Sequence, residues 1–362
     1  MSGAGLTITG RAAPHSHAGS SVDRIMLQVC LALVPATVFG LYLFGWPALL
    51  LWVITCASAV ATEALCLLLQ DKPLSRLRDS SALLTGWLLA LTLPPWAPWW
   101  IGAGGAAFAI AVGKQLYGGV GQNIFNPAML ARVALLVSFP VHMTTWVQPD
   151  LLSSGAPGPW AALDIVFGGG IPDGVTGPTI LGEMKTAQGA GTVSELAAGS
   201  FNWLDSLTGS TAGSLGETSE LLVLLGGLWL LALRIISWHI PVAMLGTTVL
   251  LAAIFHRADP AHYASPLLHL TSGGIMLGAF FIATDYVTSP SSKTGQLIFG
   301  AGCAAVLFAI RAWGGFPEGV GFAVLFMNAF TPLLDRYCKP RAYGRNLRGR
   351  PTVARTPARK VR

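Results

Sequence analysis

Charge is scarce in this chain. Only 10% of its 362 residues are Asp, Glu, Lys or Arg, and 53% are apolar, whereas a soluble domain carries about 25% charged residues. Long apolar runs such as Phe299–Ile310 have no counterpart in an ordinary water-soluble core. The composition therefore excludes a typical soluble enzyme and predicts an all-α, polytopic membrane protein.

Paired cysteines are also lacking. The five cysteines are scattered without a Cys-x-x-Cys arrangement, and the seven histidines show no ligand spacing. A disulfide framework, an iron–sulfur cluster or a metal site built by this chain alone is therefore not expected. The first 23 residues are polar and have no apolar core of the signal-peptide kind.

Ten apolar segments are expected to lie in a membrane, wholly or in part. They are residues 25–44, 47–69, 81–93, 99–112, 124–142, 221–236, 240–256, 267–284, 297–312 and 320–334. Segment 81–93 stops at Pro94-Pro95, and at ~1.5 Å per residue it is too short to cross a ~30 Å hydrocarbon layer. We expect it to be a half-membrane helix that protein or water buries.

Lysine and arginine predict the orientation. With the N-terminus inside, the inner side receives the tail 336–362, which holds 10 of the 22 basic residues. The loop 143–219 contains one basic residue, Lys185, and seven acidic ones, so it is expected outside. The tail is expected to anchor the topology at anionic lipid, since no aromatic interleaving favours nucleic acid.

This pattern divides the chain into five parts. They are a cytoplasmic N-terminal segment 1–24, a first membrane repeat 25–142, a periplasmic loop 143–219, a second membrane repeat 220–335 and a basic cytoplasmic tail 336–362.

The two membrane halves share a glycine pattern. Gly102-Ala103-Gly104 is echoed by Gly300-Ala301-Gly302, and Gly119-Val120-Gly121 by Gly319-Val320-Gly321, at offsets of 198 and 200 residues. Five spans per half is an odd number, so the second copy must be inverted. Inverted repeats with broken helices place a binding site at the repeat interface. The alternative is that Gly and Pro recur by chance.

The loop contains the motif Asp-Gly-Val-Thr-Gly-Pro-Thr, which runs from Asp173 to Thr179. Gly177 permits a left-handed or close-approach backbone, Pro178 fixes φ, and Thr179 offers a hydroxyl. Alone, this is an ordinary loop turn. Residues 205–211 repeat its Asp-x-x-Thr-Gly-x-Thr spacing and end at Thr211.

Three further motifs occur in a fixed order around this turn. It is followed by Gly-Ser-Leu-Gly-Glu-Thr-Ser at 213–219 and Ala-Thr-Asp at 283–285, and preceded by Gly-Gln-Asn-Ile-Phe-Asn-Pro-Ala at 121–128. From about residue 21 to 337 the chain resembles the RnfD family, the D subunits of the Rnf electron-transport complex. That family is similar to NqrB of the Na⁺-translocating NADH:quinone oxidoreductase. The implied fold is two inverted five-helix repeats of the urea-transporter type.

The resemblance implies a covalent flavin. In that family FMN is esterified through its phosphate to the last Thr of a Ser/Thr-Gly-Ala-Thr motif, which Thr176, Gly177, Pro178 and Thr179 match. Thr179 is therefore the expected attachment residue, with Thr176 and Gly177 in the cofactor-binding turn. Pro178 departs from the expected Ala and stiffens the turn. Thr211 is less favoured because it abuts the 213–219 motif.

A second, non-covalent flavin, riboflavin, is implied near residues 121–128. Asn123 and Asn126 would bind the polar edge of its ring, and Phe125 would stack on it. The alternative is that both asparagines cap helix ends. Asp285 is expected to contact an ion or flavin, or to pair with Lys293 at the inner interface.

Two further charged residues at membrane depth, Glu63 and Arg132, are expected to be structural. They would pair with each other or with another protein of the complex.

The implied function is that of a redox subunit in the bacterial inner membrane. The complex would pass electrons between ferredoxin and NAD and translocate Na⁺ or H⁺. The implied partners are the A, B, C, E and G subunits of the Rnf complex, a flavin transferase and lipid, but no nucleic acid. The chain itself has no catalytic residue, no complete active site and no metal site. Two alternatives without flavin remain, a urea-transporter-like channel and a scaffold.

Overall fold

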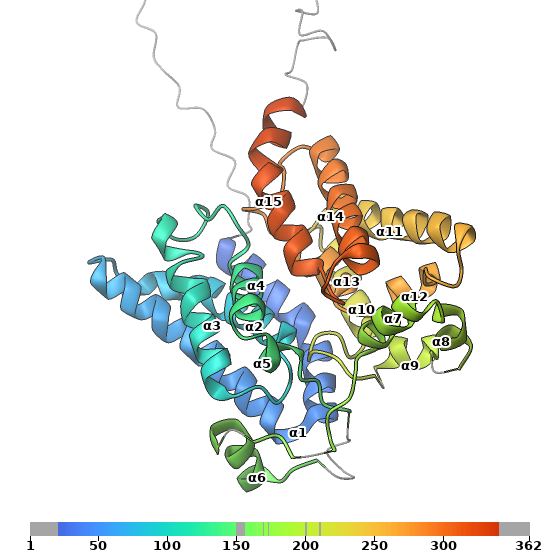
Figure 1. The fold of residues 1–362 in the computed structure, drawn as a ribbon. Helices are drawn as coiled ribbons and strands as arrows, with labels where there is room; N and C mark the ends of the chain where they lie inside the picture. The colour runs from blue at the N-terminus through green and yellow to red at the C-terminus, as the bar shows by residue number, and fades with distance from the viewer. Residues whose placement is uncertain are drawn as a thin grey trace, which may run out of the picture.

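The computed structural model describes residues 21–149, 156–168, 170–172, 174–199, 201–209 and 211–339. These residues form helices joined by turns (Figure 1), with a single β-bridge between Val147 and Thr176. The expectation of an all-α polytopic fold is thereby confirmed. Asp173, most of the N-terminal segment and most of the basic tail lie outside the described residues.

Helix α1 (Val22–Leu69) contains the first two predicted segments. It breaks at Gly45, whose φ of 73° is strained for any residue with a side chain. Each half is about 23 residues long, roughly 35 Å, so either half can cross a bilayer. The predicted boundary between residues 44 and 47 therefore coincides with a real kink.

The rest of the first half consists of short helices. They are η1 (Leu74–Asp79), α2 (Ser81–Thr92), α3 (Trp99–Ala111), η2 (Gln115–Tyr117), α4 (Pro127–Ser138) and α5 (Pro140–Thr144). Helix α2 is as short as expected. The predicted span 124–142 is wrong as one helix, because Asn126 caps α4 at its start and Pro140 begins a separate helix.

The long loop is folded. It contains α6 (Pro159–Leu163), η3 (Asp164–Gly168), α7 (Ile180–Ala190), α8 (Val193–Gly199) and α9 (Trp203–Thr208). Leu181 and Met184 of α7 form a buried cluster with Leu268 and Ala264 from the second half. This packing fixes the start of α7 against the membrane part of the protein.

The second half contains both long and broken helices. They are α10 (Glu220–Ala232), α11 (His239–Ala258), α12 (Pro266–Leu270), α13 (Ile275–Leu277), η4 (Gly278–Ile282), α14 (Lys293–Trp313) and α15 (Val320–Tyr337). The predicted continuous span 267–284 is wrong, since a turn at Gly273, with φ of 74°, separates α12 from α13. A half-membrane element therefore occurs in each half.

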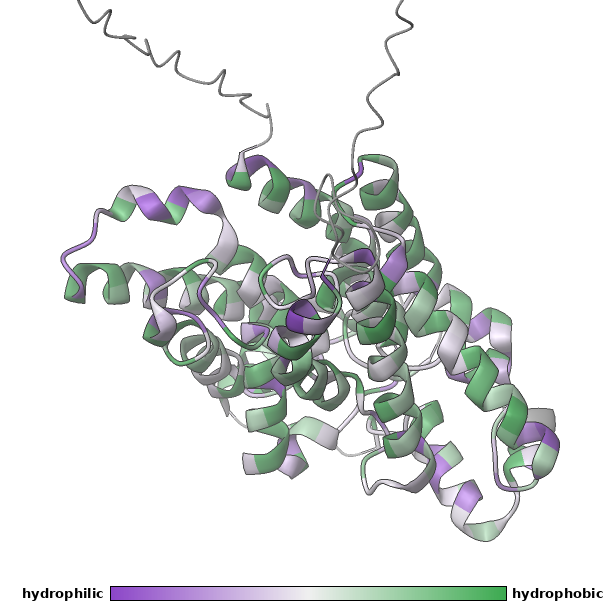
Figure 2. Ribbon diagram, turned by 90° about the horizontal axis from the view of Figure 1, so that it is seen from above, coloured by the Kyte–Doolittle hydropathy of each residue, from purple (hydrophilic) through white to green (hydrophobic). Residues whose placement is uncertain are grey.

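The described residues include three helices that are long and apolar enough to span a membrane, namely α1, α11 and α14. Large apolar side chains face outward along them, including Val38, Leu65, Leu250 and Ile298, each at least 45% exposed. Figure 2 shows apolar residues over most of the helical surface. The chain is thus a multi-pass membrane protein. The start of α1 and the end of α15 lie on the opposite side of the molecule from α6 (Figure 1).

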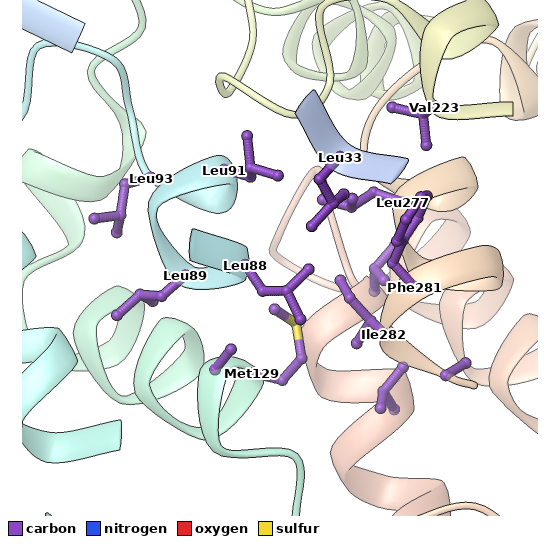
Figure 3. Close-up of a cluster of buried hydrophobic side chains, with 14 of the residues drawn as sticks. Leu33, Leu88, Leu89, Leu91, Leu93, Met129, Val223, Leu277, Phe281 and Ile282 are labelled. Atoms are coloured by element: carbon purple, nitrogen blue, oxygen red, sulfur yellow. The ribbon is translucent and has the colours of Figure 1, made fainter. Parts of the chain in front are cut away.

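The core lies where the two half-membrane elements meet. Figure 3 shows Leu88 and Leu91 of α2 beside Leu33 of α1, Leu277 of α13 and Ile282 of η4. All five side chains are at most 6% exposed. Side chains from the broken helices of the two halves therefore meet at the centre of the protein.

The element order supports the proposed repeat. Helices α13, α14 and α15 begin 194, 194 and 193 residues after α2, α3 and α4. A Cβ on Gly102 of α3 would lie 2.4 Å from Thr55 of α1, and one on Gly300 of α14 would lie 2.7 Å from Ile240 of α11. Both glycines thus allow the same kind of close helix contact. The inversion of the second copy stays a prediction.

One prediction concerns helix packing. A Cβ on Gly226 of α10 would lie 2.4 Å from the carbonyl oxygen of Ala32 in α1, whereas nothing lies within 4 Å of one on Gly246 of α11. Gly226→Ala should lower the free energy of unfolding by about 1–3 kcal/mol. Gly246→Ala should raise it by about 0.5–1 kcal/mol. Thermal unfolding of the detergent-solubilised protein measures both, and equal shifts would contradict the packing.

Candidate functional site

Thr179 is the N-cap of helix α7. Its Oγ1 accepts a hydrogen bond from the backbone N–H of Gly182 at 3.1 Å, and its φ of −77° and ψ of 159° are extended. The hydroxyl therefore lies at the positive end of an 11-residue helix. An anionic group attached there would meet unpaired backbone N–H groups, which is the arrangement that binds phosphate in many proteins.

The residues before Thr179 are held against another loop segment. The Gly177 N–H donates to the carbonyl of Trp146 at 3.1 Å, and the Gln148 N–H donates to that of Val175 at 3.1 Å. A Cβ on Gly177 would lie 2.2 Å from the Gln148 amide nitrogen, so Gly177 serves close approach. The left-handed glycine in the motif is Gly174, with φ of 85°. Thr176 is exposed and pairs with Val147.

Thr179 and the competing Thr211 line the same pocket. Its other polar lining residues are Glu217, Thr271, Ser272 and Glu318. Only Thr179 stands at a helix start, because Thr211 lies in a turn after α9. Sequence spacing alone could not separate the two threonines, but the helix N-terminus favours Thr179 as the place for a phosphoester.

The pocket floor carries a cluster of charges. Glu217 and Glu318 lie beside each other, since a Cβ on Gly274 would lie 3.3 Å from Glu217 Oε1 and 3.1 Å from Glu318 Oε1. Glu217 also accepts from the Ser214 N–H at 3.3 Å, and Glu318 accepts from the Gly274 N–H at 2.5 Å. Arg132, Glu220 and Arg311 act on this pair electrostatically. Burial raises the pKa of Glu217 well above its usual range, and the charge of Glu318 raises it further.

Arg311 fills the break between α12 and α13. Its side chain is fully buried, and its two terminal nitrogens donate to the carbonyls of His269 and Ser272, both at 2.8 Å. Lys185 of α7 donates to the Arg311 carbonyl at 2.9 Å, and burial lowers the Lys185 pKa. These bonds join α7 to the end of α14. They also supply partners for carbonyls that the interrupted helix leaves free.

A second pocket lies near the start of α1. It brings together Asn123, Asn126 and Asp285, three of the predicted site residues, with Ser81 and Lys114. The rest of its lining is mostly apolar, from α1, α2 and η4, and includes Met26, Leu84, Leu88 and Phe281. Residues about 160 positions apart in the sequence thus meet at one site, as expected for a site at a repeat interface.

Asn126 has the capping role that was one of the two alternatives. Its side-chain oxygen accepts from the N–H groups of Ala128 and Met129 at 3.1 and 3.2 Å, and its amide nitrogen donates to the Ile282 carbonyl at 3.4 Å. Asn126 therefore joins α4 to the end of η4. Asn123 caps no helix, since its amide donates to the Phe125 carbonyl at 3.1 Å.

Phe125 and Asp285 differ from expectation. Phe125 is half-buried but outside the lining of the pocket, so the structure does not direct it to stack on a ring there. Asp285 accepts from the Val287 N–H at 3.3 Å and from the Thr288 hydroxyl at 3.1 Å. These bonds form a local turn, and the alternative pairing of Asp285 with Lys293 is not among the ion pairs of the described residues.

Glu63 and Arg132 do not pair with each other. Glu63 forms a buried ion pair with Lys114 at 2.5 Å and accepts from the Gln115 amide at 2.9 Å. Lys114 also donates to Ser81 Oγ at 2.6 Å, at the start of α2. Arg132 lies 5.9 Å from the centre of the Trp146 ring. The Glu63–Lys114 pair therefore holds the start of α2, and Arg311 holds the break between α12 and α13.

Sequence reasoning missed Lys114, Arg311 and Glu318 as buried charges. From the sequence, none of these three residues was given a place in a site. A signal was present, since Lys114 and Arg311 are 197 residues apart, close to the glycine offsets. No group of His, Cys, Asp and Glu suited to a metal ion occurs in the described ranges.

Comparison with known proteins gives one family. Residues 9–344 match the model of the NQR2, RnfD, RnfE family. A protein of Stutzerimonas stutzeri, named as the D subunit of an ion-translocating oxidoreductase complex, is 62% identical over 346 residues, which cover 95% of this chain and 98% of the relative. Proteins of the same name from Halorhodospira halophila and Escherichia fergusonii are 49% and 43% identical. The aligned region covers 94% of this chain and 96% of the Halorhodospira halophila protein, and 91% of this chain and 97% of the Escherichia fergusonii protein.

These similarities extend over both membrane halves and the loop between them, so they include both pockets. The chain belongs to the NQR2, RnfD, RnfE family.

Proposed function

We propose that this chain is the component of an ion-translocating oxidoreductase complex that carries FMN, ester-linked through its phosphate to Thr179. The near full-length similarity to proteins named as the D subunit of such a complex supports the general role. The complex would couple electron transfer between ferredoxin and NAD to the movement of Na⁺ or H⁺.

The observation that supports the attachment residue is the N-cap geometry of Thr179. The hydroxyl is half-buried, lines a pocket and lies at the N-terminus of α7. A phosphodiester carries negative charge, and the partial positive charge of the helix end stabilises it. A bound flavin supplies one- and two-electron transfer, while the chain supplies position and polarity.

The second pocket is the proposed riboflavin site. Asn123 and Asn126 offer amides, and the lining is otherwise mostly apolar, as small-molecule sites commonly are. The segment α13–η4 runs between the two pockets, from Ser272 and Gly273 to Thr284 and Asp285. Its eight helical residues span roughly 12 Å. The two flavin sites would thus lie at opposite ends of one broken helix.

The placement in the cell follows from the charge distribution. We infer a bacterial inner-membrane protein with both termini in the cytoplasm and the loop 143–219 in the periplasm. Its proposed partners are the A, B, C, E and G subunits of the complex and a flavin transferase that modifies Thr179. The similarity to redox-complex proteins supports this role over that of a urea-transporter-like channel or a passive scaffold.

The attachment can be tested on the denatured chain. Coexpressed with its flavin transferase, the wild-type chain should fluoresce as a flavoprotein in a denaturing gel, because only a covalent link survives denaturation. Thr179→Ala should abolish the fluorescence, and Thr211→Ala should retain it. Peptide mass spectrometry should locate FMN on Thr179. An adduct on the Thr211 peptide, or a non-fluorescent wild-type chain, would reject the assignment.

The second flavin has its own test. Asn126→Leu removes the α4 cap and the bond to Ile282, so the purified protein should lose most of its extractable riboflavin while it keeps the covalent flavin. Asn126→Asp retains the capping oxygen and lacks the amide N–H groups. It should therefore lose riboflavin with little loss of thermal stability. Riboflavin content equal to the wild type in both variants would show that the pocket has another role.

A further inference from the structure

The carboxyl pair at Glu217 and Glu318 lies outside the roles assigned above. The two residues come from different parts of the chain, Glu217 before α10 and Glu318 between α14 and α15. Their carboxyl groups come together at Gly274, where a Cβ would lie 3.1 Å from Glu318 Oε1 and 3.3 Å from Glu217 Oε1. Two ionised carboxylates at such a site repel each other and only accept hydrogen bonds, so the pair is stabilised by one proton that the two groups share.

The charges around the pair also indicate that it holds one proton. The titratable groups that face the pair are Glu220 at the start of α10, Arg132 of α4 and Arg311 of α14. Lys185 and His269 reach this region only through bonds to the Arg311 backbone and guanidinium. Three carboxyl groups and two guanidinium groups would leave one negative charge. Because an uncompensated buried charge is costly, a single bound proton neutralises the cluster.

The pair faces a pocket through which it can exchange a proton with water. Both carboxyl groups line the pocket that Thr179 also lines. Ser272, a residue that is 4% exposed, lines it too, and its buried hydroxyl has no hydrogen-bond partner within the described part of the chain. A buried hydroxyl without a partner indicates a water or another polar ligand in the pocket. Glu217 and Glu318 themselves are half-buried, so a proton can reach them from the loop side.

We propose that Glu217 and Glu318 form a shared-proton site beside the group that Thr179 carries, and that it binds its proton more tightly when negative charge is added to that group. The coupling rests on the proposed flavin at Thr179, whereas the shared proton rests on this chain alone. An electron delivered by another protein of the complex adds one negative charge to the pocket. This added charge makes loss of the shared proton less favourable, so the pair releases it to loop-side water only at a higher pH. By linkage, the proton equally favours the reduced state.

Infrared spectroscopy of the purified complex tests the shared proton. The resting wild-type complex should show absorption of a protonated carboxyl group that disappears as the pH is raised. Glu217→Gln and Glu318→Gln should each remove this absorption, since Gln keeps the shape and leaves a lone carboxylate. Asp205→Asn removes an exposed carboxyl of the same loop and should retain the absorption. Thr179→Ala should also retain it. Absorption unchanged in both Gln variants would overturn the site.

The coupling is measured in the same samples after reduction. In the wild type, the pH at which the carboxyl absorption disappears should move upward on reduction, and in Thr179→Ala it should stay in place. An unmoved wild-type midpoint would overturn the coupling. Gel fluorescence of the samples shows separately whether Thr179 carries the flavin. Failure of the attachment is thus distinguished from failure of the carboxyl pair, which the resting absorption alone decides.

Discussion

The structure depends on supplying partners to backbone groups where helices stop inside the membrane. A helix that ends at depth leaves carbonyl and N–H groups unpaired, and lipid offers them nothing. In the second half, Arg311 binds the carbonyls of His269 and Ser272, and Glu318 accepts from the Gly274 N–H. At the end of α2, the Gly216 N–H donates to the Leu91 carbonyl. Fixed charges and neighbouring backbone thus take the place of water.

These supports also create the two pockets. Side chains of α2 meet those of α13 and η4 at the centre, the first half of α2 lines one pocket, and the segment α13–η4 runs between the two pockets. Lys114 and Ser81 belong to one pocket, and Glu318 and Ser272 to the other. Glu318 therefore both accepts from the backbone of the broken helix and gives its pocket polarity.

The folded loop adds a position that the membrane helices alone would not provide. Helix α7 packs through Leu181 and Met184 against the region of α12, and Lys185 ties it to the end of α14. A group attached to Thr179 would therefore be held at a fixed place over the core instead of on a free tether. For an electron carrier, a fixed distance to its partners is the main benefit of a covalent link.

The sequence predicted the membrane class, the boundary between residues 44 and 47 and the short helix α2, because hydrophobicity and helix length are local properties. It also predicted Asn123, Asn126 and Asp285 as candidates, through family resemblance. The break of 267–284 at Gly273 was missed, although the run Thr-Ser-Gly-Gly at 271–274 is a turn signal within the apolar segment.

Only the tertiary structure decided which charges meet. Glu63 was expected to pair with Arg132 or with another protein of the complex and instead pairs with Lys114, and Glu217 lies beside Glu318 across about 100 residues of sequence. Thr179 and Thr211 have the same local spacing, yet one begins a helix and the other does not. The physical reason is that a buried charge is stabilised by whatever partner packing brings near. That partner is set by how the two halves fit together, and local sequence does not encode it.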